Sequence, residues 1–267
     1  MRELRFPLAA ALSLVAVAGC SRSTVSADLP RAAASQPAVG STESLLRAMH
    51  DRYAGKWYRN LTFVQTSTFY KPDGTVDRAE TWREAGLMPG RLRIDTDTAS
   101  GRGVIYANDS MYVFQDGKLA RTLDRQNELM VLGFDVYFLT PEQSLAKLQK
   151  LGFDASKFRR ELHEGREYYV VGAAPGDITS KQFWIDAEYL LFWRVFLPPR
   201  GPGGKVQEIR FQNYQQHGGG WVAEEVDFRE DGKRTFFEKY ADVKTNAKLD
   251  ESVFDPKRYA ETRFWWR

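Results

Sequence analysis

Few side chains in this 267-residue chain have the types and spacing that catalysis or metal binding requires. Its three histidines are His50, His163 and His217, and none of them stands at the spacing of a metal-ligand pair. The sequence has no Gly-x-Ser-x-Gly motif, no phosphate-binding loop and no His-Glu-x-x-His motif, and nothing marks a serine as a nucleophile. We interpret the histidines as surface or hydrogen-bonded side chains, and we predict no enzymatic activity, no metal and no cofactor.

Carboxylates are frequent, but no other catalytic group accompanies them. Asp95, Asp97, Glu224 and Glu225 fall in strand-like or turn-like segments, where we expect solvent-exposed side chains. Asp186 follows a strand-like segment at an expected hairpin turn, and its side chain is predicted to cap that turn. These acids therefore indicate solvated positions rather than acid–base chemistry.

Cys20 is the one cysteine of the chain, and its surroundings indicate a use for its thiol. Arg2 and Arg5 flank the start of a mostly apolar segment, residues 6–19, which has the length of a signal-peptide core and is too short to span a membrane. Val17-Ala18-Gly19-Cys20 resembles a bacterial lipobox. In such signals the thiol receives diacylglycerol, cleavage makes the cysteine the first residue, and its new amine is acylated.

The resemblance to a lipobox implies how the mature chain is attached. We predict a lipoprotein signal peptide over residues 1–19 and an anchor of several acyl chains at Cys20, since one chain alone holds a protein only marginally. Ser21 rather than aspartate follows the cysteine, which favours the outer membrane, facing the periplasm of a Gram-negative bacterium. Residues 20–40 are rich in Ser, Ala and Pro and are predicted to form a flexible tether. The alternatives are an ordinary signal peptide with an incidental cysteine, or a cysteine in the core.

Composition limits the class of the remaining chain. Hydrophobic residues make up 43% and aromatic residues 13% of the sequence, which suffices for one globular domain with a sizeable core. The formal net charge of +3 is too small to indicate nucleic-acid binding. A single cysteine excludes internal disulfides and a thiolate metal cluster. No second segment reaches membrane-spanning length, so we expect a domain that is soluble apart from its lipid.

Two helices are indicated by their end signals. Apolar side chains at helical spacing follow a capping Ser41, and this stripe is predicted to pack against a sheet. Thr140 begins a second helix with a capping-box pattern, and Gly152 ends it. The apolar residues 128–139 before it are predicted to be helical or a buried loop.

Segments with strand-like alternation, separated by Gly, Asp, Asn and Pro turns, flank this helical insertion. About four or five strands precede it, and about six or seven follow it at roughly ten-residue spacing, which is typical of an antiparallel meander. Sheets of this size curl into barrels or open half-barrels. We therefore predict a mainly β fold, an unclosed antiparallel β-barrel, in which the N-terminal helix and the mid-chain helical insertion cover the concave face.

Three short motifs occur in order along this plan. They are Phe63-Val64-Gln65, the Met-Pro-Gly-Arg-Leu-Arg-Ile-Asp of residues 88–95, and Trp184-Ile185-Asp186 followed by Arg194. From Ser41 to Tyr259 the chain resembles the LolA/LolB-like superfamily, typified by a periplasmic lipoprotein carrier and its outer-membrane acceptor. The resemblance implies an unclosed barrel of about eleven strands whose apolar concave face receives acyl chains or another hydrophobic ligand. The carrier is soluble, whereas the lipobox-like segment makes this chain resemble the lipidated acceptor.

The half-barrel domain is predicted over residues 41–260, followed by an aromatic tail at 261–267. Bulky apolar side chains recur on its strands, and some of them are candidates for the wall of a ligand cavity. The same residue types are typical of a filled core, so the sequence leaves both interpretations open. The candidates are Phe63, Trp82, Leu92, Ile94, Tyr112, Phe114, Phe183, Trp184, Trp193 and Phe211. The tail contains Phe264-Trp265-Trp266, which suits either a membrane interface or docking back on the barrel.

The lipobox and the sheet plan together predict an outer-membrane lipoprotein that is not an enzyme. It binds a lipid or the acyl chains of a lipoprotein in its half-barrel and acts in lipoprotein or lipid sorting or transport across the periplasm. The alternative is an envelope sensor or protein-interaction module on the same fold, with a protein partner. In either case we expect a monomer that is attached to the membrane through its N-terminal lipid and binds no nucleic acid.

Overall fold

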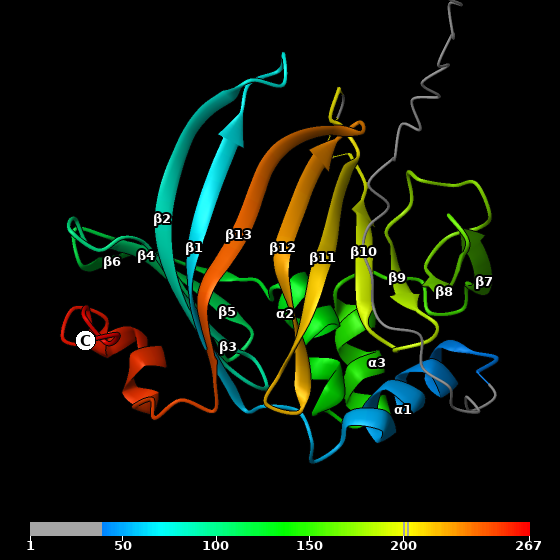
Figure 1. The fold of residues 1–267 in the computed structure, drawn as a ribbon, viewed down its shortest axis with the longest axis horizontal. Helices are drawn as coiled ribbons and strands as arrows, with labels where there is room; N and C mark the ends of the chain where they lie inside the picture. Colours follow the sequence, from blue (N-terminus) through cyan, green and yellow to red (C-terminus); the bar gives the residue numbers. More distant parts are fainter. Residues whose placement is uncertain (1–38, 200, 202) are drawn as a thin grey trace, which may run out of the picture.

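The computed structural model describes residues 39–199, 201 and 203–267. The predicted signal peptide, Cys20 and the tether up to residue 38 lie outside the described residues. Within the described part, a single curved antiparallel sheet carries all the strands (Figure 1). The N-terminal helix and the helices of the mid-chain insertion lie against the concave face of this sheet, and the C-terminal segment lies on the convex face.

The sheet has thirteen strands that follow one another as hairpins. Six of them precede the helical insertion and seven follow it. The strands are β1 (Asn60–Tyr70), β2 (Val76–Leu87), β3 (Arg91–Asp97), β4 (Arg102–Ala107), β5 (Ser110–Gln115), β6 (Lys118–Asp124), β7 (Phe158–His163), β8 (Arg166–Val171), β9 (Gln182–Asp186), β10 (Phe192–Leu197), β11 (Gln207–His217), β12 (Gly220–Glu230) and β13 (Lys233–Thr245).

The first and last strands meet in the middle of the sheet. β1 pairs with β13, which leaves β6 and β7 as the two outer strands, so the sheet is unclosed as predicted. The strand number is thirteen rather than about eleven. Part of this difference lies at Asp116 and Gly117, whose φ angles of 51° and 71° form a tight turn between β5 and β6.

Four helical segments account for the predicted N-terminal helix and mid-chain insertion. They are α1 (Thr42–Tyr53), α2 (Glu128–Gly133), the 3₁₀ helix η1 (Asp135–Tyr137) and α3 (Pro141–Lys150). Ser41 and Thr140 cap α1 and α3 through capping boxes, which satisfy backbone N–H groups of the first turn. Because α2, η1 and α3 connect β6 to β7, the insertion joins the two free edges of the sheet.

The main hydrophobic core lies between these helices and the concave face. Buried side chains of α1 and α3 form one cluster with alternate residues of the central and later strands, such as Phe183 and Ile185 on β9. Trp57 stacks on Tyr137 with ring centroids 4.1 Å apart, and the Tyr137 hydroxyl donates to the Leu190 carbonyl at 3.1 Å. The helices therefore fill the part of the concave face that they cover, as expected for an apolar stripe on a sheet.

The C-terminal segment covers part of the convex face. It contains the 3₁₀ helices η2 (Glu251–Phe254) and η3 (Pro256–Arg258). Tyr259 stacks on Phe114 of β5 at a centroid distance of 3.8 Å, and the Trp265 Nε1–H donates to Asp95 at 2.7 Å. Asp95 is only 2% exposed, which corrects the expectation of a solvated side chain, because a segment more than 160 residues later in the sequence covers it.

Candidate functional site

An open groove lies on the part of the concave face that the helices leave uncovered. It encloses a cavity of about 430 Å³ between the start of α2 and strands β10 to β13. In Figure 1 the upper ends of β11, β12 and β13 stand clear of the helices. The apolar wall of the groove is formed by Tyr106, Leu129, Leu197, Ile209, Phe228 and Phe236. The concave face is therefore packed under the helices and hollow beyond them.

Several charged side chains that line the groove have partners. Glu128 lies 3.2 Å from the Lys181 ammonium, and Glu230 lies 3.7 Å from Lys205. Arg125 also lines the groove, is exposed, and forms no ion pair with any other described residue. The groove therefore offers an unneutralised cation beside its apolar wall, which suits the charged end of an amphipathic anion.

Two carboxylates lie deeper on the concave face. Glu238 lines the groove on β13 and accepts a hydrogen bond from the Tyr240 hydroxyl at 2.8 Å. Glu84 is 5% exposed and lies on β2 directly opposite Phe63 and Ile94 of the neighbouring strands. Among the described residues, neither carboxylate has a Lys, Arg or His within ion-pair distance.

Burial therefore controls the protonation of these two acids. Loss of solvent raises the pKa of Glu238 to about 7, although hydrogen bonds to its carboxylate act in the opposite direction. Burial, with the negative charges of Glu238 and Asp95, raises the pKa of Glu84 well above its ordinary value of 4.5. Near neutral pH Glu238, which lines the groove, therefore carries less than a full negative charge, and this makes the groove wall compatible with an apolar ligand.

Six of the ten predicted cavity residues lie on the concave side. Phe63 stacks on Tyr240 with centroids 4.0 Å apart, and Trp82 lies 5.5 Å from Phe236 of the groove wall. The remaining four of these six residues belong to the main core beneath the helices: Leu92, Ile94, Phe183 and Phe211. None of the six lines the cavity itself, and their role in ligand binding stays a prediction.

The other four predicted residues lie in separate clusters. Tyr112 and Phe114 pack with Tyr259 under the C-terminal segment. Trp184 and Trp193 form a cluster with Tyr168 on the face of β8 to β10 opposite the main core. The register of β9 and β10 shifts between Phe192 and Arg194, so Trp193 is the extra residue of a bulge. These four side chains therefore lie away from the groove, and their role in ligand binding stays a prediction.

The groove residues that the sequence interpretation missed had one signal. Phe236, Glu238 and Tyr240 alternate along β13, so they share a face. An acid between two aromatic residues on one strand face indicates a polar group facing an apolar surface. That pattern was present in the sequence. It did not stand out, because aromatic residues occur on many strands and on both faces of the sheet.

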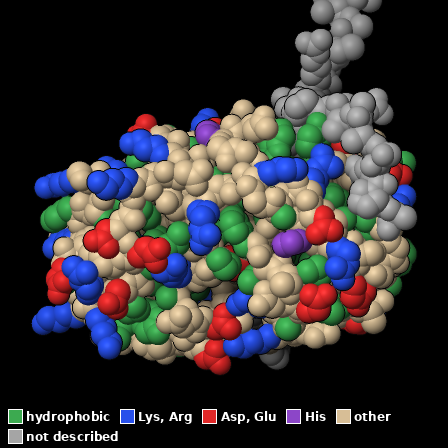
Figure 2. Space-filling view, turned by 90° about the horizontal axis from the view of Figure 1, so that it is seen from below, with side chains coloured by type: hydrophobic (Ala, Val, Ile, Leu, Met, Phe, Trp, Pro, Cys, Tyr) green, Lys and Arg blue, Asp and Glu red, His purple; other side chains and the backbone are tan. Residues whose placement is uncertain are grey.

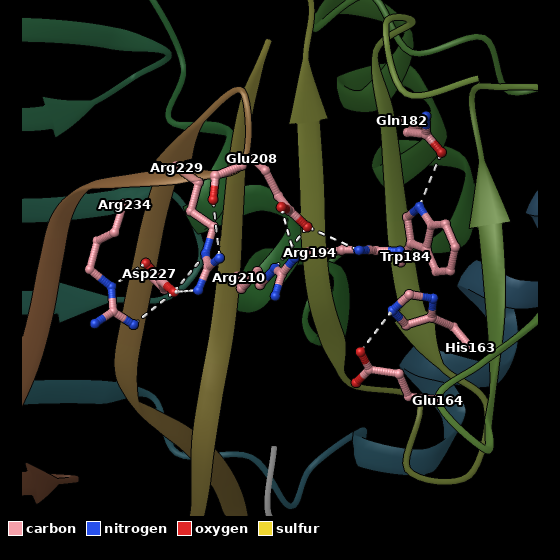
Figure 3. Close-up of polar contacts among 11 residues, drawn as sticks. His163, Glu164, Gln182, Trp184, Arg194, Glu208, Arg210, Asp227, Arg229 and Arg234 are labelled. Atoms are coloured by element: carbon pink, nitrogen blue, oxygen red, sulfur yellow. Dashed lines mark hydrogen bonds and ion pairs between the residues drawn. The ribbon is translucent and has the colours of Figure 1, made fainter. Parts of the chain in front are cut away.

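The convex face between β9 and β13 carries paired charges (Figure 3). Asp227 accepts from Arg229 at 2.9 Å and from Arg234 at 2.8 Å, and Glu208 binds Arg194 and Arg210 in the same way. The Arg194 guanidinium also lies 3.9 Å from the ring centroid of Trp184 and 4.2 Å from that of Trp193. This face is a neutralised, stacked surface rather than an open binding site.

The remaining candidate groups have structural partners. Asp186 accepts from the backbone N–H groups of Glu188 and Tyr189, which agrees with the predicted turn cap. His217 hydrogen-bonds Glu224 at 2.9 Å, and His50 bonds Asp51 at 3.0 Å. The described residues contain no group of three or more His, Cys, Asp or Glu side chains that could hold a metal ion. Acidic and basic side chains are interspersed on the face shown in Figure 2.

Comparison with known proteins identifies a fold rather than a close relative. No protein-family model and no curated protein matches the sequence. A domain described as an outer-membrane lipoprotein-sorting protein, from Vibrio parahaemolyticus, aligns with a TM-score of 0.52 at 13% identity, over 82% of this chain and 97% of its own. A DUF1329 family protein from Desulfovibrio piger aligns with a TM-score of 0.51 at 12% identity, over 80% of this chain and 95% of its own. A LolA superfamily protein from Nitrosomonas europaea aligns with a TM-score of 0.49 at 12% identity, over 81% and 98%.

These likenesses place the chain in a structural class. The Vibrio and Desulfovibrio structures share its fold along nearly their whole length. The chain therefore shares the fold of these two structures, an unclosed antiparallel sheet with helices on its concave face, and the predicted fold is confirmed. Within the described residues, no helix is both long enough and apolar enough to cross a membrane.

Proposed function

We propose that this protein is a non-enzymatic outer-membrane lipoprotein that holds an acyl chain, of a lipid or of a lipoprotein, in its concave groove. The groove is the observation on which the proposal depends. Its volume of about 430 Å³ falls in the range of about 300–1,000 Å³ that is usual for small-ligand sites. Its wall is aromatic and aliphatic, and it lies on a fold shared with a lipoprotein-sorting domain.

The side chains around the groove favour an amphipathic ligand. An acyl chain packs against Leu197, Ile209 and Phe236, where transfer from water is favourable. The exposed, unpaired Arg125 suits a negatively charged head group. The raised pKa of Glu238, about 7, leaves this half-buried carboxyl partly protonated near neutral pH and so weakens the charge that would oppose the chain.

We also propose that a lipid on Cys20 attaches the protein to the outer membrane on its periplasmic side. Cys20→Ala removes the acceptor of the lipid. We expect that variant to accumulate as an uncleaved or unacylated precursor, measured by intact-protein mass spectrometry of membrane and soluble fractions. Normal maturation of Cys20→Ala would refute the attachment but would leave the groove proposal standing.

Lipid carried by the groove itself is tested by two neighbouring substitutions. Phe236 lines the groove, whereas Phe237 is the next residue on the same strand and its side chain lies on the opposite face. The full-chain protein is purified, its non-covalently bound lipid is extracted into organic solvent, and lipid per protein is measured by mass spectrometry. We expect about ten-fold less lipid for Phe236→Glu, since a charged side chain replaces one apolar contact worth about 1.5–3 kcal/mol.

Phe237→Glu is the matched control, because it adds the same charge one residue away. It should retain the bound lipid, and circular dichroism should show that both variants are folded. The proposal fails if the unmodified protein carries no lipid, or if both variants carry equal amounts. Recovery of a protein in place of lipid would favour the sensor alternative on the same fold.

A further inference from the structure

A second hollow lies on the convex face, where the C-terminal tail meets strands β1, β2 and β13. It encloses about 260 Å³. The pairing of β1 with β13 shifts in register between Thr62 and Val64, and Asp242 on β13 has a φ of 53°. A bulge of this kind takes backbone groups out of the hydrogen-bonded ladder and bends the strand. The pocket therefore sits at an irregularity of the sheet, beneath a segment that follows the last strand.

The pocket is lined by cations that lack an ion-pair partner among the described residues. Arg83, Lys244 and Lys248 line it, and none of the three forms an ion pair with another described residue. Asp242 is the one acidic side chain among its described lining residues. On the convex face near β11 to β13, by contrast, the arginines are paired with carboxylates (Figure 3). The pocket thus groups cations without ion-pair partners, whereas the arginines near β11 to β13 are paired.

Aromatic side chains of the tail form the outer side of this pocket. Trp265 is held in place by its hydrogen bond to the buried Asp95, at 2.7 Å. Trp266 lies against Arg83, whose guanidinium is 4.9 Å from the ring centroid. Phe264 beside them is 44% exposed, and the Arg267 guanidinium lies 4.3 Å from its ring centroid. With Trp265 held against the sheet, Phe264 is exposed to solvent next to Arg267.

We propose that this pocket binds the phosphate group of a phospholipid at a membrane surface. The guanidinium of Arg83 offers paired N–H donors, and Lys244 and Lys248 add point charges, which together suit phosphate oxygens. Trp and other amphipathic aromatic residues next to Lys and Arg are typical of the membrane–water interface. A free phosphate ion uses the cations alone, whereas a phospholipid also covers the exposed Phe264.

The pocket and the groove lie on opposite faces of the sheet, so a membrane contact at the pocket sets the direction in which the groove faces. Arg83 and Glu84 are consecutive on β2, so their side chains lie on opposite faces of the sheet. A phospholipid bound at the pocket therefore holds the convex face against the membrane. The concave groove then faces away from that membrane, toward ligands that arrive through the periplasm. This second site depends neither on Cys20 nor on the ligand of the groove.

The experiment compares two probes that share the phosphate chemistry. The full-chain protein in a non-ionic detergent is titrated calorimetrically with dihexanoyl phosphatidic acid and, separately, with inorganic phosphate. We expect saturable binding of the lipid, with phosphate about ten-fold weaker because the aromatic contacts are missing. Lys244→Glu combined with Lys248→Glu should weaken lipid binding by about ten-fold or more, since two charge-assisted contacts are lost.

A matched pair of lysines serves as the control. Lys71→Glu combined with Lys233→Glu makes the same change of net charge at exposed positions in the β1–β2 turn and at the start of β13, and it should leave lipid binding unchanged. Phe264→Ala should weaken the lipid but not phosphate. Phe236→Glu in the groove should keep pocket binding, which separates this site from the groove proposal.

Three outcomes would overturn the proposal. Equal affinity for phosphate and the lipid, insensitive to Phe264→Ala, would make the pocket a site for a free anion. Lipid binding that survives the Lys244→Glu and Lys248→Glu change would place the lipid elsewhere. Absence of saturable lipid binding to the unmodified protein would exclude the site altogether.

Discussion

The two faces of the sheet handle buried charge in opposite ways. On the convex face Arg93 and Asp95 lie 2.9 Å apart with side chains 0% and 2% exposed, and Tyr259 and Trp265 donate further hydrogen bonds to Asp95. On the concave face Glu84 and Glu238 have no cationic partner among the described residues, and burial raises the pKa of both. The buried charges Arg93 and Asp95 of the convex face are therefore stabilised by pairing, whereas the concave acids Glu84 and Glu238 are stabilised by taking up a proton.

This difference separates the parts of the molecule that stabilise the fold from those suited to a ligand. A paired buried charge is tied to its partner, so removing one member leaves an uncompensated charge and costs much of the stability. An unpaired buried acid lowers the free energy of unfolding when it is ionised, and replacing it with its neutral amide removes this cost. Substitutions on the two faces should therefore change the free energy of unfolding in opposite directions.

The largest effect is expected on the convex face, at Arg93→Met. This change leaves Asp95 buried with only hydroxyl and N–H partners, and breaking such a pair costs about 3–5 kcal/mol. Urea unfolding of the purified protein measures it. Arg91→Met on the same strand and face is the control, because its pair with Glu251 is exposed and is worth about 0–1 kcal/mol. Equal losses for the two variants would mean that burial of the pair does not matter.

The next effect is of opposite sign, at Glu84→Gln on the concave face. Because the pKa of Glu84 is raised in the folded protein, its contribution to stability is full below the ordinary value of 4.5 and is lost as the pH rises toward the folded pKa. Glutamine removes this loss, so the variant should gain about 1–3 kcal/mol at about pH 8 and little at about pH 4. Denaturant unfolding at the two pH values measures the difference.

Glu80→Gln is the control for the expected gain in stability at high pH, because Glu80 lies on the same strand and face as Glu84. Its carboxylate accepts from Arg78 and Trp82, and these hydrogen bonds lower the pKa of Glu80. Its contribution is therefore present above the ordinary pKa and lost as the pH falls, so the glutamine variant should not gain stability at high pH. A gain at high pH for both variants would mean that any charge removal helps.

A smaller loss is expected at Trp265→Phe, which keeps the aromatic ring and removes the N–H that donates to Asp95. Asp95 retains Arg93 and the Tyr259 hydroxyl, so the cost should be about 1–2 kcal/mol. Trp266→Phe beside it has no such bond to lose and should change stability by less than about 0.5 kcal/mol. A larger effect at Trp266 would show that the tail is held by ring contacts rather than by Asp95.

Local signals in the sequence were sufficient to predict where helices begin, but not to predict which side chains lie on which face of the sheet. Ser41 and Thr140 mark the starts of α1 and α3 because capping is a contact within one turn. The bulge at Trp193 and the cover over Asp95 depend on pairing and on contacts across about 160 residues, which no local pattern contains. Aromatic residues stood on both faces, so composition alone did not select those that line the groove.

The smallest effect on stability is expected at Arg125→Ala, and it sharpens the same contrast. Arg125 is exposed and unpaired among the described residues, so its removal should change the free energy of unfolding by less than about 0.5 kcal/mol. If its charge serves a ligand in the groove, a fatty acid should bind about two- to five-fold more weakly, whereas the corresponding fatty alcohol should bind as before. Fluorescence competition with both ligands measures this ratio. An equal loss for acid and alcohol would assign Arg125 to the shape of the groove and leave its charge without a role.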